Sequence, residues 1–177
     1  MITLANTPVL ETERLILRAP VATDYPAFAD FYASDRSRHM GGPLERDRAW
    51  RAFGHIIGHW AMRGFGMFTI TDRRTEAALG MAGAWFPEGW PEQEVGWSLW
   101  TPAAEGKGIA TEAAQAVLAY VWGHLGWATT VSYVDRGNVR SAALAARLGA
   151  VIDAGATGLP AGPVHDVWRH SNPRSLA

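Results

Sequence analysis

Residues 93–121 place an apolar segment, a loop with a glycine on each side of a lysine, and an alanine-rich segment in direct succession. The segment 93–100 is typical of a β-strand, and Ile109, Ala113 and Val117 recur at the spacing of one helix face. A loop that leaves a strand and opens a helix points free backbone N–H groups, together with the positive end of the helix dipole, at one spot. This succession restricts the chain to folds in which helices pack on a sheet, and it predicts an anion site at the loop.

The loop itself leaves two interpretations open. Gly106 and Gly108 let the backbone approach a phosphate closely, and Lys107, the only lysine in the chain, can add a charge. The alternative is a glycine-rich helix start without a ligand. A Walker loop needs a glycine where Thr101 stands, and a dinucleotide fingerprint needs one where Thr111 stands. These differences exclude P-loop ATPases and Rossmann dehydrogenases.

The rest of the chain continues the mixture of strand and helix patterns. The predicted order is one strand, two helices, three strands, a helix, a strand, a helix and two short strands. This order predicts an α/β (α+β) fold, a mixed sheet with helices packed on it, in a single domain over residues 1–177. Besides the segments already named, the expected strands are 14–18, 66–72, 78–86, 128–134, 150–157 and 164–170, and the expected helices lie within 22–34, 43–64 and 138–150.

Two of these helices carry further local signals. Thr23 or Asp24 is expected to cap the first helix, since short polar side chains accept hydrogen bonds from free N–H groups there. The second helix shows an apolar stripe that is expected to face the core. The stripe consists of Trp50, Phe53, Ile57 and Trp60.

Composition and charge narrow the class of protein. Hydrophobic residues make up 48% and charged residues 19%, which is ordinary for a globular protein. Sixteen basic and seventeen acidic residues leave a net charge of −1 without a block of like charge, so no nucleic-acid or membrane surface is expected. The absence of cysteine excludes disulfides, thiol nucleophiles and thiolate metal sites. The N-terminal segment lacks a signal-peptide pattern, which favours a soluble cytoplasmic protein.

Two long segments carry a resemblance to a known family. The stretch LWTPAAEGKGIATEAAQAVLAYVW, followed by VSYVDRGNVRSAALAARLGA, resembles the GNAT superfamily of N-acetyltransferases and, within it, the RimJ/RimL-like branch. In that family a G-x-G/A loop follows a strand, and a helix with N-x-x-S and L-G follows one strand later. The resemblance extends over nearly the whole chain, including LETERLILRA, GFGMFTI and EVGWSLW in family order. It implies a twisted mixed sheet of about seven strands with splayed central strands and about four helices.

The resemblance implies acetyl-CoA as the acetyl donor and assigns a site for it. The backbone of Ser98, Leu99 and Trp100 is expected to bind the pantetheine arm, and Asn138 to contact the same arm. Ala103 and Glu105 replace residues that are usual in the family, and the acidic Glu105 is expected to point to solvent. The pyrophosphate is expected to meet the N–H groups of Glu105, Gly106, Lys107, Gly108, Ile109, Ala110 and Thr111.

The resemblance also implies a base. Glu94 lies four residues before the pantetheine-binding triplet, where some GNAT enzymes carry a glutamate base, and it shares a strand face with Gly96 and Ser98. The alternative is a glutamate at the strand start that faces solvent. Glu92 is a poorer candidate because it lies in the preceding turn. A backbone N–H near Leu99 is the expected donor to the developing oxyanion.

For the acid, Ser141 matches a serine that lies near the thioester sulfur in RimL-like enzymes. It is a candidate both to contact the donor and to protonate the leaving thiolate, directly or through water. The alternative is a solvated helix serine. Ala145 stands where many GNAT enzymes have a tyrosine acid, and Tyr133 is a weaker substitute. The missing tyrosine keeps open a second function, a catalytically weak or inactive acyl-CoA-binding or regulatory module.

The acceptor is expected to be a primary amine, either a protein N-terminus or a small molecule, bound by a monomer or a homodimer. Arg38 and His39 lie in a segment that borders the acceptor cleft in this family and are candidates to contact the acceptor; the alternative is a plain loop. Trp90 is expected to line an acceptor pocket or a dimer contact. His55 and His59 share a helix face, but no third ligand is evident, so no metal is expected.

Overall fold

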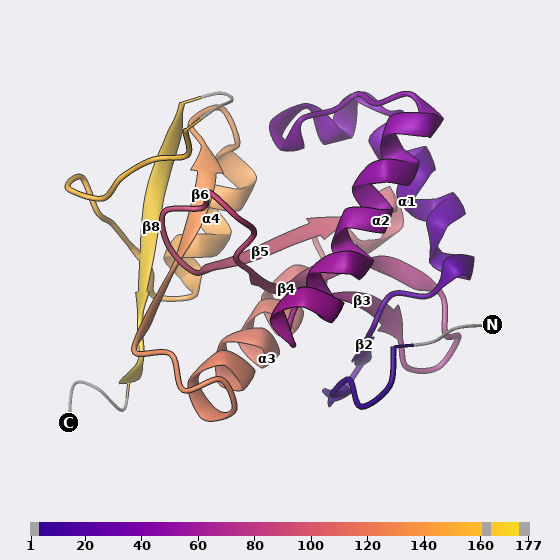
Figure 1. Ribbon diagram of the computed structural model, residues 1–177, viewed down its shortest axis with the longest axis horizontal. Coiled ribbons are helices and arrows are strands. Elements are labelled where there is room, and N and C mark those ends of the chain that lie inside the picture. The colour runs from indigo at the N-terminus through magenta and orange to yellow at the C-terminus, as the bar shows by residue number, and fades with distance from the viewer. Residues whose placement is uncertain (1–3, 161–163, 174–177) are drawn as a thin grey trace.

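The structure is a computed structural model that describes residues 4–160 and 164–173 of the chain. One eight-stranded sheet has the order β1-β2-β3-β4-β5-β6-β8-β7, and the helices pack on it (Figure 1). The strands are β1 (Leu10–Glu11), β2 (Leu15–Arg18), β3 (Met67–Asp72), β4 (Ala78–Trp85), β5 (Glu94–Leu99), β6 (Thr129–Asp135), β7 (Val151–Ile152) and β8 (His165–Ser171). The helices are α1 (Tyr25–Tyr32), α2 (Arg46–Arg63), α3 (Ile109–Gly123) and α4 (Val139–Arg147), with 3-10 turns at Ala22–Asp24, Asp35–Met40 and Pro102–Ala104.

The expected mixed sheet is confirmed, with two differences in detail. The strand β1 was not predicted, because two residues that pair with β2 are too short to show a period. The strand expected over 150–157 is reduced to β7, and the chain turns away after it. Among the helices of the described ranges, none is long and apolar enough to cross a membrane.

The expected splaying of the central strands is also confirmed. β1 to β5 pair as antiparallel neighbours, and β4 pairs with β5 as far as Leu99. In the described part of the chain, the parallel contact of β5 with β6 has one register pair, Glu94 with Val131. Around that pair the Gln93 carbonyl accepts from the Val131 N–H at 3.0 Å, and the Ser132 hydroxyl donates to the Val95 carbonyl at 2.6 Å. Beyond it no described strand pairs with the edge of β5 that faces β6, and this edge is open in that sense.

Side chains of the central strands alternate between two layers. Phe68 and Ala82 face α3 on one side, and Met81 faces α1 and α2 on the other. The predicted stripe of α2 is correct for Phe53 and Trp60 but wrong for Trp50, which is 61% exposed. Trp50 is exposed because, at that turn, α2 contacts the ring of Tyr25 edge-on, at 4.9 Å, rather than the sheet.

Asp24 occupies the N-cap position of α1 without capping it, which corrects the prediction from sequence. Its buried carboxylate instead accepts hydrogen bonds from Arg18, from the Thr69 hydroxyl at 2.8 Å and from the Val21 N–H at 3.0 Å. Burial disfavours the ionised carboxylate, but these hydrogen bonds outweigh burial and lower the pKa of Asp24. The carboxylate thus ties the start of α1 to β2 and β3.

Candidate functional site

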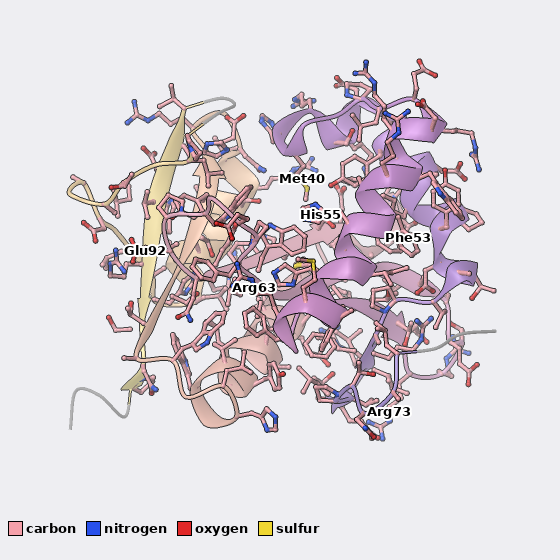
Figure 2. All side chains as sticks on the ribbon, in the orientation of Figure 1. Met40, Phe53, His55, Arg63, Arg73 and Glu92 are labelled. Atoms are coloured by element: carbon pink, nitrogen blue, oxygen red, sulfur yellow. The ribbon has the colours of Figure 1, made fainter. Side chains whose placement is uncertain are left out.

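A cavity of about 410 Å³ lies where β5 and β6 part. Its lining includes Glu94, Ser98, Asn138 and Ser141, so the structure brings these predicted residues to one place. The opposite wall comes from α1, α2 and the turn Asp35–Met40. Met40, labelled in Figure 2, contributes to this wall, so the cavity lies between the two halves of the molecule.

Glu94 is the first residue of β5, at the closed end of the cavity. Its Oε2 atom accepts a hydrogen bond of 2.7 Å from the indole N–H of Trp90. Burial raises the pKa of Glu94 to about 7, although the hydrogen bond from Trp90 acts in the opposite direction. Glu94 therefore lines a cavity rather than facing bulk solvent, and its carboxylate can accept a proton near neutral pH.

Trp90 lies in the turn before β5, where its backbone N–H donates to the Pro87 carbonyl at 3.2 Å. Its indole packs against Val131 and Tyr133 and lines the cavity. Trp90 thus lines a cavity, while its role toward an acceptor stays a prediction, and its hydrogen bond to Glu94 was not foreseen. That bond forms because the turn folds back over β5, and a periodic pattern of apolar residues does not predict such a fold.

Glu92 is engaged elsewhere, on the far side of the same turn. Both of its carboxylate oxygens accept from the Arg169 guanidinium of β8, each at 2.8 Å. The Nε atom of Arg169 also donates to Asp153 at 2.7 Å. Glu92 therefore joins the turn to β8 and is not among the residues that line the cavity.

Asn138 and Ser141 belong to the first turn of α4. The Oδ1 atom of Asn138 accepts from the Ser141 N–H at 3.1 Å, so the predicted N-cap is confirmed. This bond leaves the amide NH₂ group of Asn138 for the cavity, which both residues line. Ser141 is half-buried there.

Tyr133 of β6 also lines the cavity. Its hydroxyl is buried near the backbone of Glu92. Burial and the nearby carboxylates of Glu92 and Glu94 raise the pKa of Tyr133 to about 12. The phenol therefore stays protonated at neutral pH and can only donate or accept a hydrogen bond there.

The glycine loop has the geometry of an anion site. Gly106 and Gly108 adopt left-handed backbone angles, with φ of +70° and +76°, which favours glycine at both positions. The first hydrogen bond of α3 runs from the Glu112 N–H to the Gly108 carbonyl. The N–H groups of the three preceding residues consequently have no partner within the helix. They belong to Ile109, Ala110 and Thr111.

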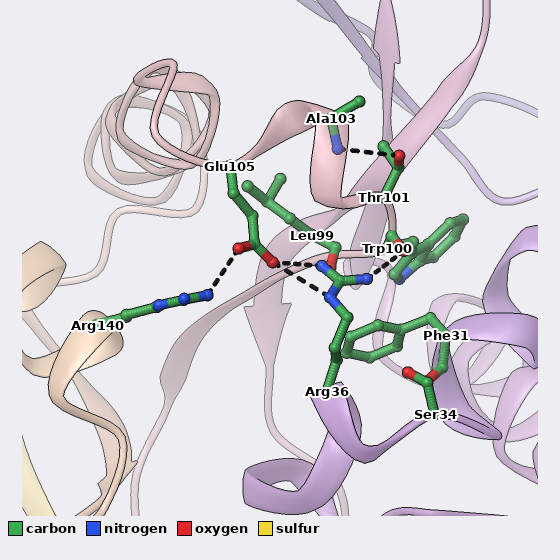
Figure 3. A network of polar contacts seen from close by, with 9 residues as sticks. All are labelled: Phe31, Ser34, Arg36, Leu99, Trp100, Thr101, Ala103, Glu105 and Arg140. Carbon is green, nitrogen blue, oxygen red and sulfur yellow. Dashed lines mark hydrogen bonds and ion pairs between the residues drawn. The ribbon is translucent and has the colours of Figure 1, made fainter.

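Glu105 does not point freely to solvent, so that expectation is wrong. Its carboxylate lies between two guanidinium groups: Arg36 donates to Oε1, and Arg140 donates to Oε2 at 2.6 Å (Figure 3). The hydrogen bonds from Arg36 are the main reason that the pKa of Glu105 is lowered. The two arginines neutralise the carboxylate and bring net positive charge beside the free N–H groups of α3.

Arg36 also reaches the end of β5. It donates to the Leu99 carbonyl at 2.9 Å and to the Trp100 carbonyl. The backbone N–H of Trp100 donates to the Leu79 carbonyl of β4. The backbone N–H and carbonyl of the preceding residue, Leu99, therefore point to the opposite side, toward β6. The Trp100 indole is buried against Phe28, 5.6 Å away edge-on, so Trp100 offers the cavity no side chain.

His59 is a structural residue. Its Nε2 atom accepts from the Phe86 N–H at 3.0 Å, so Nδ1 carries the hydrogen and donates to the Phe65 carbonyl at 2.9 Å. Burial lowers the pKa of His59 and keeps the ring neutral. Both ring nitrogens are engaged, and the ring stacks on Trp85 with centroids 4.3 Å apart. His59 therefore fixes one wall of the cavity rather than binding a metal with His55.

The two candidate residues in the turn before α2, His39 and Arg38, differ in whether they line the cavity. His39 lines the cavity and lies 3.2 Å from the carboxylate of Asp135. Arg38 is exposed, pairs with Asp35 at 2.8 Å, and lies outside the cavity lining. The turn thus contributes His39 and Met40 to the site, but not Arg38.

Comparison with known proteins agrees with this geometry. Residues 14–151 match the acetyltransferase (GNAT) domain family. An acetyltransferase from Agrobacterium tumefaciens str. C58 is 36% identical, with a TM-score of 0.88 over 97% of this chain and 99% of that one. An acetyltransferase of the GNAT family from Bacillus anthracis shares the fold at 18% identity, with a TM-score of 0.73 over 92% and 96% of the two chains.

The fold is also shared with RimL, a ribosomal-protein alpha-N-acetyltransferase solved in complex with coenzyme A. The identity is 18%, and the TM-score is 0.72 over 93% of this chain and 98% of that one. The family match covers most of the chain, and the splayed strands and the glycine loop lie within it. The chain therefore belongs to the GNAT family of acetyltransferases.

Proposed function

We propose that this chain transfers an acetyl group from acetyl-CoA to a primary amine by direct attack within a ternary complex. The observation that carries the proposal is the open edge of β5, which borders a cavity with Glu94 at its closed end. A backbone edge can bind an extended chain, and a carboxylate beside it can deprotonate an amine. The CoA complex of RimL, which shares this fold, supports the choice of donor.

The residues present fit acetyl-CoA as a substrate. Three free N–H groups at the start of α3 and the guanidinium groups of Arg36 and Arg140 form a positive site for the pyrophosphate. Leu99 presents its N–H on the open edge of β5, and Asn138 lines the cavity from the start of α4. Both suit the amides of a pantetheine arm. Ser98, at the cavity wall, belongs to the same proposed binding segment.

In the proposed reaction, Glu94 takes a proton from the ammonium form of the acceptor. The neutral nitrogen attacks the thioester carbonyl, forming a C–N bond, and the Leu99 N–H donates to the oxyanion that develops. The C–S bond then breaks. The second amine proton passes to the departing thiolate through Ser141 or a water molecule. Positioning the amine next to the thioester accounts for a large part of the rate acceleration.

A second candidate function rests on one observation. Ala145, which is buried, occupies the position at which many relatives carry the tyrosine acid. This substitution favours an acyl-CoA-binding module with little or no turnover. One assay distinguishes this function from acetyl transfer.

The test is thiol release from acetyl-CoA across a panel of primary amines, combined with calorimetry of acetyl-CoA binding. The proposed function predicts binding together with amine-dependent thiol release, and it predicts loss of release, but not of binding, in Glu94→Gln. Binding without release for every amine class would favour the module. Absence of binding would exclude both functions.

A further inference from the structure

We propose that the acceptor is a small aromatic or aliphatic monoamine that has no carboxylate beside its amino group. The inference rests on the proposed function and adds the substrate class.

Around Glu94 the cavity has an apolar and aromatic wall. It is built from side chains of α1, the turn Asp35–Met40, α2 and the turn before β5, together with Trp85 of β4, the register partner of Glu94. Stacking on His59, which is held by two backbone hydrogen bonds, fixes the orientation of Trp85. Such flat, fixed surfaces favour a ring or a branched alkyl group. The residues that form the wall are Phe28, Tyr32, Met40, Ile56, Trp85 and Trp90.

The charges in the cavity favour a cation over a zwitterion. Among the described residues that line it, none is Arg or Lys. Glu94 offers a partner for an ammonium group. A carboxylate on the adjacent carbon of a free amino acid would lie close to Glu94 and would have no fixed cation to pair with, so it is repelled.

The two histidines of the lining do not change this conclusion. His39 faces Asp135 at 3.2 Å, and His165 pairs with Asp135 across the β6–β8 ladder. Val131, the register partner of Glu94, lies four residues earlier on β6, which is about 13 Å away at about 3.3 Å per residue. Both histidines therefore lie near the other end of β6, beyond the reach of a carboxylate attached next to the reacting amine.

A small amine fits this wall better than a peptide does. The backbone amides of a bound peptide need hydrogen-bond partners, which a strand edge supplies and a wall of apolar side chains does not. The open edge of β5 lies on the opposite side and is assigned to the donor. The whole cavity of about 410 Å³ also has to hold the thioester end of the donor, which leaves room for one ring or short alkyl group.

The test compares matched amines in steady-state acetylation with acetyl-CoA. Phenylalaninol and phenylalanine have similar shape and amine basicity but differ in the carboxylate. We expect kcat/KM for phenylalaninol and phenethylamine to exceed that for phenylalanine by at least about 30-fold, since a buried like-charge contact is unfavourable. Spermidine and a peptide amide with an N-terminal phenylalanine complete the panel, and both are expected to be poorer acceptors than phenethylamine.

The outcomes separate the two proposals. Equal kcat/KM for phenylalanine and phenylalaninol, or a clear preference for the peptide or for spermidine, would overturn the substrate class while leaving acetyl transfer in place. Failure of every amine, with acetyl-CoA still bound, would instead overturn the proposed function and the substrate class together.

Discussion

The two ends of the cavity are built in different ways. At the proposed donor end, recognition depends on backbone groups: the free N–H groups of α3 and the open edge of β5 near Leu99. At the proposed acceptor end, it depends on side chains, such as Glu94, Trp85 and Trp90, which the chain brings from separate elements. A backbone site needs the right order of elements and tolerates many sequences. A side-chain site can change with single substitutions while the fold persists.

The largest effect is expected from substitution of the proposed base at the acceptor end. Glu94→Gln should lower kcat/KM at pH 7 by about 100- to 1,000-fold, because the amide cannot accept the proton. The pKa of Glu94, about 7, predicts that the wild-type rate rises with pH as the carboxylate ionises. This inflection should disappear in the variant. Calorimetry should find unchanged affinity for acetyl-CoA, and a weakened affinity would place Glu94 at the donor end instead.

The donor end is tested through Gly108. A side chain at φ of +76° strains the backbone by about 1–2 kcal/mol, so Gly108→Ala should distort the start of α3 and weaken acetyl-CoA binding about 10-fold. The KM for the amine should not change. Gly123→Ala, in the last turn of the same helix, has free space and no positive φ, and serves as the control. Equal effects of the two variants on binding would contradict a role for the loop backbone.

A smaller effect is expected from the indole that contacts the base. Trp90→Phe keeps the ring but removes the hydrogen bond of 2.7 Å to Glu94. That bond lowers the pKa of Glu94, so its loss should move the pH inflection upward and reduce kcat at pH 7 about 3-fold. A pH–rate profile measures both. An unchanged inflection together with a raised KM would mean that Trp90 contacts only the acceptor.

The smallest effect concerns the carboxylate at the donor end. Glu105→Gln should free the charges of Arg36 and Arg140 for the pyrophosphate and tighten acetyl-CoA binding about 3-fold, with a steeper dependence on salt. Calorimetry at two ionic strengths measures both changes. Weaker binding would show that Glu105 serves mainly to hold Arg36 in place.

The features that could be predicted from the sequence are those formed by residues that are neighbours along the chain. The strand, glycine loop and helix of residues 93–121 were predicted from local patterns, and Asn138 was identified as an N-cap, because each depends on neighbours along the chain. The opening between β5 and β6 came only from the family resemblance. It is a property of strand pairing that no single segment encodes.

The contacts that sequence patterns missed join distant segments. Arg36 and Arg140 lie 69 and 35 residues from Glu105, and neither carries a periodic signal that points to it. The exposure of Trp50 was missed for a related reason: a helix pattern shows which residues share a face, but not where that face passes beyond the sheet.

The register pair of Glu94 with Val131 has a mechanical consequence. Two strands that separate from one point form an angle with a vertex, and rotation about a vertex displaces each residue in proportion to its distance from it. Leu99 is five residues along β5, or about 17 Å from the vertex, so a rotation of about 5° would move it by roughly 1.5 Å. The backbone of Glu94 would hardly move. A rotation of the two halves of the sheet about this point would therefore widen the mouth of the cavity while the proposed base keeps its position.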